Sequence, residues 1–229
     1  MAEKMLKNSF KDIMQARILS GELKPGDRLP PERELAAQMG ISRGSVNQGI
    51  LDLERIGFLR VVPRKGTFVA EYVRNATPQT LSAIMSYDSA LIDGALFRDL
   101  MSMRILIERE CVRLACGNMT EENMRCLEEL TTQIYSSCDD ALVNALYDYH
   151  RCLTRISGNA AYELVFQSFE LMLRNLIRAH YENRDELRKC LPLYEKLSSA
   201  IENRDTAKAD ELILNILTLA SNYLNVLLK

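Results

Sequence analysis

The sequence predicts a mainly α-helical protein of two domains, a small N-terminal domain of helices with one β-hairpin and a C-terminal antiparallel bundle of helices. Five of the six prolines lie at or before residue 78, after which long helical patterns follow one another. The charge also changes: residues 1–75 hold 13 Lys/Arg against 9 Asp/Glu, whereas residues 76–229 hold 16 against 22. We therefore expect a first domain over 1–75, facing a polyanion, and a second over 76–229.

The overall composition is ordinary for a globular protein. Apolar residues make up 47% and charged residues 26% of the chain, as in soluble domains. No stretch approaches the roughly 18 apolar residues of a membrane-spanning helix, and the charges near the N-terminus are too closely spaced for a signal peptide. We therefore expect a cytoplasmic protein with no membrane partner.

Six cysteines raise the question of a redox or metal role. They are Cys111, Cys116, Cys126, Cys138, Cys152 and Cys190, and no two have the C-x-x-C spacing of a ligand or redox motif. Most occupy apolar positions of helical patterns, where reduced cysteine is a common packing residue. We favour reduced core thiols over a redox or metal role.

Two helices are expected before residue 40. The first has a broad apolar stripe, made of Phe10, Ile13, Met14, Ala16, Ile18 and Leu19, and it stops at Gly21. A turn at Pro25-Gly26 follows. In the second helix we expect Pro30 and Pro31 in the first turn, Leu35 and Met39 on the inward face, and Gly40 as the stop.

A third helix is expected to begin after Ser42, its N-cap, with an arginine where an acidic residue is usual. Val46, Ile50 and Leu53 form one apolar stripe, and Arg43 lies on another face with Gly44, Asn47 and Gln48. The first acidic residue after Ser42 is Asp52, although the positive end of a helix dipole favours acids. We interpret Arg43 as a residue whose anion is an external phosphate. The alternative is a solvated polar helix end.

A β-hairpin with a basic tip is expected next. Two β-branched runs, 58–62 and 67–73, are separated by Pro63-Arg64-Lys65-Gly66. Two helices, a helix with base-reading side chains and a basic hairpin together make a winged helix-turn-helix, which places the last helix in the DNA major groove.

The stretch GDRLPPERELAAQMGISRGSVNQGILDLERIGFLRVVPRKGTFV resembles the DNA-binding domain of the GntR family of bacterial transcription regulators. The shared motifs are L-P-x-E-R-x-L, G-x-S-R-x-x-V, L-x-x-x-G and G-T-F-V, and the similarity runs from about residue 6 to residue 69. It implies DNA contacts at Arg33, Ser42, Arg43, Gly44, Ser45 and Gly66, to which we add Asn47, Gln48, Arg64 and Lys65. The family usually has Arg-Glu where this chain has Asn47-Gln48, so one common guanine or phosphate contact is lost.

The remainder is expected to form an antiparallel helical bundle. The helices expected from the pattern are 80–86, 92–117, 121–136, 140–157, 161–182, 184–203 and 206–228. The order of a winged helix and a helical domain resembles the FadR subfamily, and so do LFRDLMSMRILIERECVRLA, HRCLTRISGN, IRAHYENRDELR and YEKLSSAIENRDTAKA.

This resemblance implies a transcription regulator that binds a palindromic operator in double-stranded DNA as a homodimer and responds to a small organic acid or acyl-CoA-like effector. The alternative is a protein-interaction module whose bundle only oligomerises and binds no effector. We expect no enzyme, because the chain has no Gly-rich phosphate loop, nucleophile elbow or H-E-x-x-H motif.

The helical domain is expected to bind its effector without a metal or other cofactor. Many relatives hold a divalent metal with one Asp and three His; here His150 matches the first His, but Leu146, Tyr194 and Ile216 stand at the other positions. The chain has only 2 His. The residues expected at an effector pocket are Arg104, Tyr147, His150, Arg178, His180 and Tyr194. Arg104 could equally form an ion pair with Glu108, its i+4 neighbour.

Overall fold

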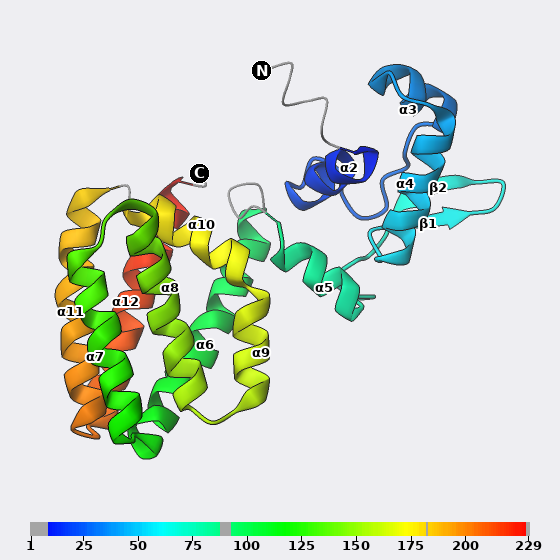
Figure 1. The fold of residues 1–229 in the computed structure, drawn as a ribbon. Coiled ribbons are helices and arrows are strands. Elements are labelled where there is room, and N and C mark those ends of the chain that lie inside the picture. Colours follow the sequence, from blue (N-terminus) through cyan, green and yellow to red (C-terminus); the bar gives the residue numbers. More distant parts are fainter. Residues whose placement is uncertain (1–8, 88–92, 182, 228–229) are drawn as a thin grey trace. The chain divides into compact units, whose positions relative to one another are not determined.

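The computed structural model describes residues 9–87, 93–181 and 183–227, and it confirms the mainly α-helical fold (Figure 1). The chain forms two compact units. The first contains α2 (Phe10–Leu19), α3 (Glu32–Met39), α4 (Arg43–Arg55), β1 (Leu59–Val62), β2 (Gly66–Val69) and α5 (Pro78–Met85). The second contains α6 (Gly94–Asn118), α7 (Glu121–Ser136), α8 (Asp139–Ile156), α9 (Ala160–Ser168), α10 (Glu170–Tyr181), α11 (Arg184–Glu202) and α12 (Thr206–Leu227).

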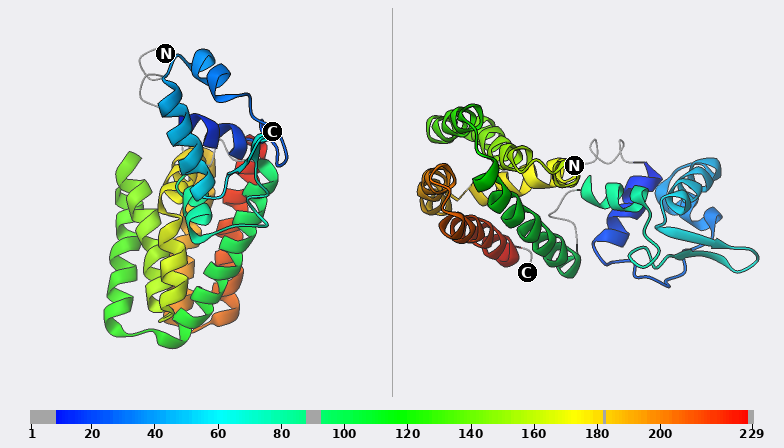
Figure 2. Two further views of the ribbon diagram at one scale, coloured as in Figure 1. Left: turned by 90° about the vertical axis from the view of Figure 1, so that its right-hand side faces the viewer. Right: turned by 90° about the horizontal axis from the view of Figure 1, so that it is seen from below.

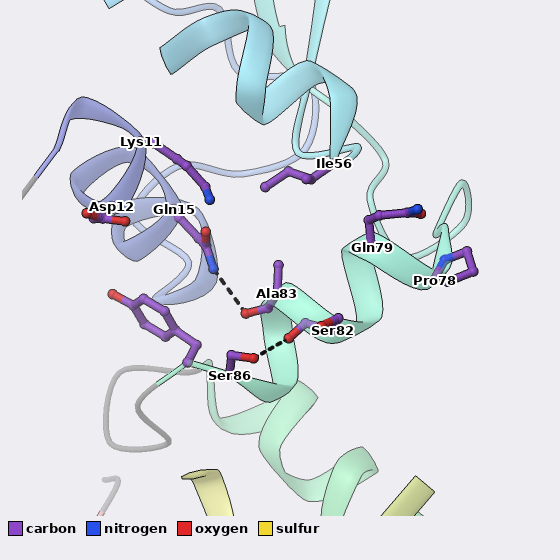
Figure 3. A pocket seen from close by; sticks show the side chains of 10 residues that line it. Lys11, Asp12, Gln15, Ile56, Pro78, Gln79, Ser82, Ala83 and Ser86 are labelled. Atoms are coloured by element: carbon purple, nitrogen blue, oxygen red, sulfur yellow. Dashed lines mark hydrogen bonds between the residues drawn. The ribbon is translucent and has the colours of Figure 1, made fainter. Parts of the chain in front are cut away.

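The first unit extends to Tyr87, beyond the boundary at residue 75 that the charge pattern suggested. Two hydrogen bonds hold helix α5 there, and Figure 3 shows the one between Gln15 and Ala83. Thr80 Oγ1 donates to the carbonyl of Ile56 at 2.6 Å, and Gln15 Nε2 donates to the carbonyl of Ala83 at 3.0 Å. A hollow of about 590 Å³ lies between α2, α5 and the C-terminal end of α4. A change in charge along the sequence therefore did not locate the end of this unit.

The core of the first unit comes from the apolar stripes of its helices. Met14, Val46, Leu53 and Phe58 are fully buried, and further buried side chains are Phe10, Ile18, Leu19, Leu35 and Ile50. Ile13, Ala16 and Met39 are half-buried at the edges. Both prolines precede α3, with Pro31 as its N-cap, so the expectation that they lie in the first turn is wrong. The extended backbone of Pro31 explains this position, because a helix cannot include that conformation.

The wing is a two-stranded antiparallel hairpin in which Val62 faces Gly66 and Leu59 faces Val69. It is shorter than the expected runs, because the second strand ends at Val69. Residues just before α3 pair with the edge of β2 that does not face β1. Leu29 N donates to Thr67 O at 2.9 Å, and Val69 N donates to Asp27 O at 2.8 Å. This extra pairing holds the hairpin against the start of the helix-turn-helix.

The second unit is an antiparallel helical bundle, as expected. Helix α6 packs on α8 and α12, α7 packs on α8 and α11, and α11 packs on α12; Figure 2 shows these helices side by side. Large buried side chains such as Phe97, Leu146 and Leu197 fill its core. The expected helix ends Ile92, Glu182 and Leu228 lie outside the described residues. No helix among the described residues is long and apolar enough to cross a membrane.

The single helix expected over 161–182 is instead two helices, α9 and α10, which meet at Phe169. No Pro or Gly marks the break. Phe166 and Phe169 are both only 3% exposed, and the backbone of Phe169 donates to the carbonyl of Phe166 at 3.1 Å, in a tight turn. The i→i−3 hydrogen bond at Phe169 interrupts the α-helical pattern there, and the apolar periodicity of the sequence does not reveal this break.

Candidate functional sites

The first candidate site is the exposed face at the start of α4. Ser42 is the N-cap, as expected, and its Oγ accepts a hydrogen bond from Ser45 N at 3.0 Å. Val46 is fully buried. Five of the residues predicted to contact DNA are exposed on this helix, namely Arg43, Gly44, Ser45, Asn47 and Gln48. The cap and the buried stripe thus orient one polar face of α4 outward.

Arg43 lies at the N-terminal end of this face. The first turn of α4 contains no acidic residue, and no carboxylate pairs with Arg43 within the part of the chain that the structure describes. The free backbone N–H groups of this turn and the guanidinium together provide donors for an anion. The predicted role of Arg43 as a phosphate or guanine ligand remains a prediction that this geometry favours.

Asn47 connects the two helices of the helix-turn-helix. Its Nδ2 donates to Glu32 Oε1 on α3 at 3.1 Å, while Gln48 Nε2 donates to Asp52 Oδ1 at 3.3 Å. Both amides therefore have acidic partners before any DNA arrives. Asn47 keeps its carbonyl oxygen and one N–H free for a base edge, because the bond to Glu32 uses only one donor.

Further cations lie on α3 and on the wing. Arg33, Arg64 and Lys65 are exposed, and the last two form the hairpin turn. Gly66 has a φ of +117°, and a Cβ there would lie 3.0 Å from the guanidinium Nε of Arg28. Glycine therefore lets Arg28 lie close against the wing.

Two further exposed arginines, Arg28 and Arg60, lie on the wing sheet beside the predicted DNA-contact residues. Phe68 of β2 is the pairing partner of Arg60 on β1 and also, through an isolated bridge, of Arg28. Residues opposite one another on adjacent strands share a face of the sheet, so the two arginines lie on one face. Only the strand pairing reveals this, since they are far apart in the sequence.

The second candidate site is a chain of buried polar groups in the helical unit. Arg104 Nε donates to Glu108 Oε1 at 2.5 Å, and His150 Nδ1 lies 2.5 Å from Glu108 Oε2. His150 Nε2 lies 3.0 Å from the hydroxyl of Tyr194, and Tyr181 continues the chain, its hydroxyl 3.4 Å from that of Tyr194. Each carboxylate oxygen of Glu108 thus has its own partner, and the network joins α6, α8, α10 and α11.

Electrostatics keep Glu108 ionised although it is only 2% exposed. Burial alone would raise its pKa, but the charge of Arg104, the charge of His150 and the hydrogen bonds with both lower the pKa to about 2. Burial also raises the pKa of the Tyr194 and Tyr181 hydroxyls, so both remain neutral. The network therefore holds an internal carboxylate beside an arginine. The ion pair of Arg104 with Glu108, one of the two sequence interpretations, is present.

Four of the six predicted effector residues border one small space. Arg104, His150, His180 and Tyr194 line it together with Tyr181, which sequence reasoning missed. The space measures about 10 Å³, enough for about one water molecule. A larger ligand there would require these side chains to move.

Tyr147 and Arg178 lie elsewhere. The ring of Tyr147 stacks on Phe166, with the Arg174 guanidinium 4.1 Å from its centre, and its buried hydroxyl has no hydrogen-bond partner among the described residues. Arg178 borders a groove of about 690 Å³ between the α7–α8 turn, α10 and α11. The apolar wall of this groove is Leu142, Val143, Leu187 and Leu191. Tyr181 borders both the groove and the small central space.

The residues around His150 do not fit a metal site. Both ring nitrogens have partners, Glu108 and Tyr194. The positive guanidinium of Arg104, which is also bonded to Glu108, would repel a metal cation. Leu146 and Ile216, which are buried, have no donor atoms. The described residues contain no group of three or more His, Cys, Asp or Glu side chains that could hold a metal ion, whereas such metals need several N, O or S ligands.

A basic winged helix-turn-helix unit followed by a helical unit with a buried polar network defines a DNA-binding regulator with a ligand-binding domain. Comparison with known proteins agrees. Residues 6–69 match the bacterial regulatory proteins of the gntR family, and residues 99–219, more than half of the chain, match the FCD domain. The chain therefore belongs to the GntR family and carries an FCD effector-binding domain; it is a transcription regulator and not an enzyme.

Relatives with curated names support the same class. The chain is 28% identical over 183 residues to the fatty acid metabolism regulator protein of Serratia proteamaculans, covering 80% of this chain and 75% of that protein. It is 23% identical over 215 residues to the HTH-type transcriptional regulator LutR of Bacillus subtilis, covering 91% and 96%. Among solved structures, Lar, which controls the expression of the Listeria monocytogenes agr system, has a TM-score of 0.59 at 14% identity, covering 93% of each chain. That similarity shows the shared fold.

Proposed function

We propose that this regulator binds a palindromic operator as a homodimer and responds to an amphiphilic carboxylate, a small organic acid or an acyl-CoA-like compound, in the helical domain. The DNA part rests on Arg43, whose guanidinium has no carboxylate partner in the described structure. One recognition helix reads only a few base pairs, so two copies on a palindrome give the specificity that an operator requires. The protein would act in the cytoplasm, with the DNA.

The effector part rests on the groove that Arg178 borders. Its volume of about 690 Å³ lies within the usual range for ligand sites, about 300–1,000 Å³. The four apolar side chains of its wall suit a carbon chain, and the guanidinium suits a carboxylate. Relatives are named for fatty acid metabolism, which is compatible with such a ligand.

In the structure, the carboxylate of Asp140 pairs with the Arg178 guanidinium that the ligand would bind. Arg178 Nη2 lies 2.7 Å from Asp140 Oδ1, and the two side chains are 46% and 81% exposed. Exposed ion pairs contribute only about 0–1 kcal/mol, so a ligand carboxylate replaces Asp140 at little cost. The ligand would also touch Tyr181, and through it the buried network that ends at Arg104.

Calorimetry with a series of straight-chain carboxylates, the matching alcohols and acyl-CoA compounds tests the effector. We expect carboxylates to bind more tightly than alcohols of equal length. Arg178→Met should weaken carboxylate binding about tenfold or more, because a hydrogen bond to a charged group contributes about 1.5–3 kcal/mol. Arg113→Met, an exposed arginine on α6 away from the groove, is the control. Binding that Arg178→Met leaves unchanged would place the site elsewhere.

Selection of operator sequences from random DNA, with light scattering of the full chain at micromolar concentration, tests the DNA part. Selected sequences should be palindromic, and the protein should be dimeric. A monomer that binds single half-sites would contradict the proposal. The alternative, a module that binds only proteins, predicts no affinity for DNA; strong salt dependence of binding to DNA excludes it, because phosphate contacts release counterions.

A further inference from the structure

Two cysteines on neighbouring helices of the second unit lie side by side. Cys126 on α7 and Cys152 on α8 have their Sγ atoms 3.3 Å apart, although 26 positions separate them in the sequence. Cys126 is half-buried and Cys152 is buried. The absence of a C-x-x-C motif led us to expect unconnected core thiols; helix packing has instead made a pair.

An arginine accompanies this thiol pair. Arg155 Nη2 lies 3.4 Å from Cys126 Sγ and 3.8 Å from Cys152 Sγ. A guanidinium beside sulfur stabilises the negative charge that makes a thiol reactive. The same positive charge repels metal cations, so the arrangement favours oxidation of the pair over metal binding.

We propose that Cys126 and Cys152 form a reversible disulfide when the protein meets hydrogen peroxide. A disulfide requires sulfurs about 2.05 Å apart, so the two atoms would approach by about 1.3 Å from their present separation. Side-chain rotation on two packed helices provides this. Neither cysteine belongs to the DNA surface or to the effector groove.

The chemistry balances with peroxide as the two-electron oxidant. The sulfur of Cys126 attacks one oxygen of the peroxide, an S–O bond forms, and the O–O bond breaks. The second oxygen leaves as water with the proton that the thiol has lost. The sulfur of Cys152 then attacks Cys126, forming the S–S bond and releasing the hydroxyl as water with the proton of Cys152.

Burial decides the order of the two steps. The pKa of the Cys152 thiol is raised to about 12, mainly by burial and to a lesser extent by its hydrogen bond with Cys126. Cys152 therefore remains a neutral thiol, while the more exposed Cys126 meets the oxidant first. The roles are those of an attacking and a resolving cysteine.

The disulfide would connect α7 to α8 near the helix ends opposite their connecting turn. Cys126 lies in the second turn of α7 and Cys152 in the last turns of α8, so the bond closes a loop through the α7–α8 hairpin. Cys152 also lies two residues from His150 in the buried network. Oxidation would therefore restrain the helices that carry the network and border the groove, and raise the melting temperature.

Peptide mapping of the full chain after treatment with stoichiometric hydrogen peroxide tests this proposal. We expect a linked peptide containing Cys126 and Cys152, a loss of two titratable thiols from 6, and full reversal by dithiothreitol. Arg155→Met should slow the reaction about tenfold, since it removes the cation beside the sulfur. Cys138→Ser, at an exposed cysteine, should change neither the product nor the rate.

Three outcomes would overturn the proposal. These are a sulfinic acid on Cys126 with Cys152 unmodified, disulfides formed only between chains through Cys138, or Zn²⁺ binding that depends on both thiols without disulfide formation. Cys126→Ser, at a half-buried position, should remove the linked peptide and keep the far-ultraviolet circular dichroism of the parent. This comparison separates lost chemistry from lost folding.

Discussion

Arg104 and Glu108 form an ion pair inside the helical unit, with Arg104 Nε 2.5 Å from Glu108 Oε1. Their side chains are 8% and 2% exposed. Each charge has lost its water, so each depends on its partner for stabilisation. Glu108 also contacts His150. Removal of the carboxylate therefore leaves a buried cation without compensation.

Glu108→Gln should lower the free energy of unfolding by about 3–5 kcal/mol, the usual cost of breaking a buried ion pair. The glutamine keeps the shape of the side chain, so the change in unfolding free energy reports the loss of the negative charge. Urea unfolding provides the measurement. Glu110→Gln is the control, since its partner Arg113 is 54% exposed, and such surface changes alter stability by about 0.5 kcal/mol or less. Equal effects of the two substitutions would show that the Glu108 charge contributes no more to stability than a surface carboxylate does.

Acid should remove the stabilisation that Glu108 provides. Its pKa is lowered from 4.5 to about 2 in the folded protein, so between these values the unfolded chain binds more protons at this site than the folded one does. Stability from this group is therefore complete above pH 4.5 and decreases as the pH falls toward 2. The difference in unfolding free energy between the parent and Glu108→Gln should decrease over that range. A difference independent of pH would contradict this assignment.

Metal removal should have no effect on stability. The two nitrogens of His150 are held by Glu108 and Tyr194, and Leu146 and Ile216 cannot coordinate. Elemental analysis of protein purified without a histidine tag should give well under one equivalent of Zn, Ni or Mn. EDTA should leave the melting temperature unchanged, because no metal-binding energy is coupled to folding. Stoichiometric metal whose removal lowers the melting temperature would show that the ligand positions were misaligned.

Arg43→Ala should weaken binding to a selected operator by about 1–3 kcal/mol, the value of a good contact to a base or phosphate. Fluorescence anisotropy at one fixed salt concentration measures this, because phosphate contacts make affinity depend on salt. Arg55→Ala is the matched control on the same helix. Arg55 is exposed in the last turn and its partner Asp52 is 3.8 Å away. Unchanged affinity for Arg43→Ala would disprove the assigned role of α4.

Local sequence signals were sufficient to predict most of the secondary structure of the DNA-binding unit. The Ser42 cap, the stripe of Val46, Ile50 and Leu53 and the stop at Gly40 all depend on residues within a few positions of each other. Such short-range signals depend mainly on neighbouring residues in the sequence. The shared face of Arg28 and Arg60 was not predicted, because it arises from strand pairing between distant segments.

The helical unit was less predictable in detail. The sequence by itself determined that it is a bundle, that a three-histidine metal site is impossible with 2 His, and that Arg104 and Glu108 lie one turn apart. Only the tertiary structure decided that Glu108 also meets His150, that Cys126 meets Cys152, and that the chain breaks at Phe169. The physical reason is that helical periodicity specifies which side of a helix is buried. Which buried groups touch depends on how neighbouring helices are packed, and a pattern within one helix carries no information about that.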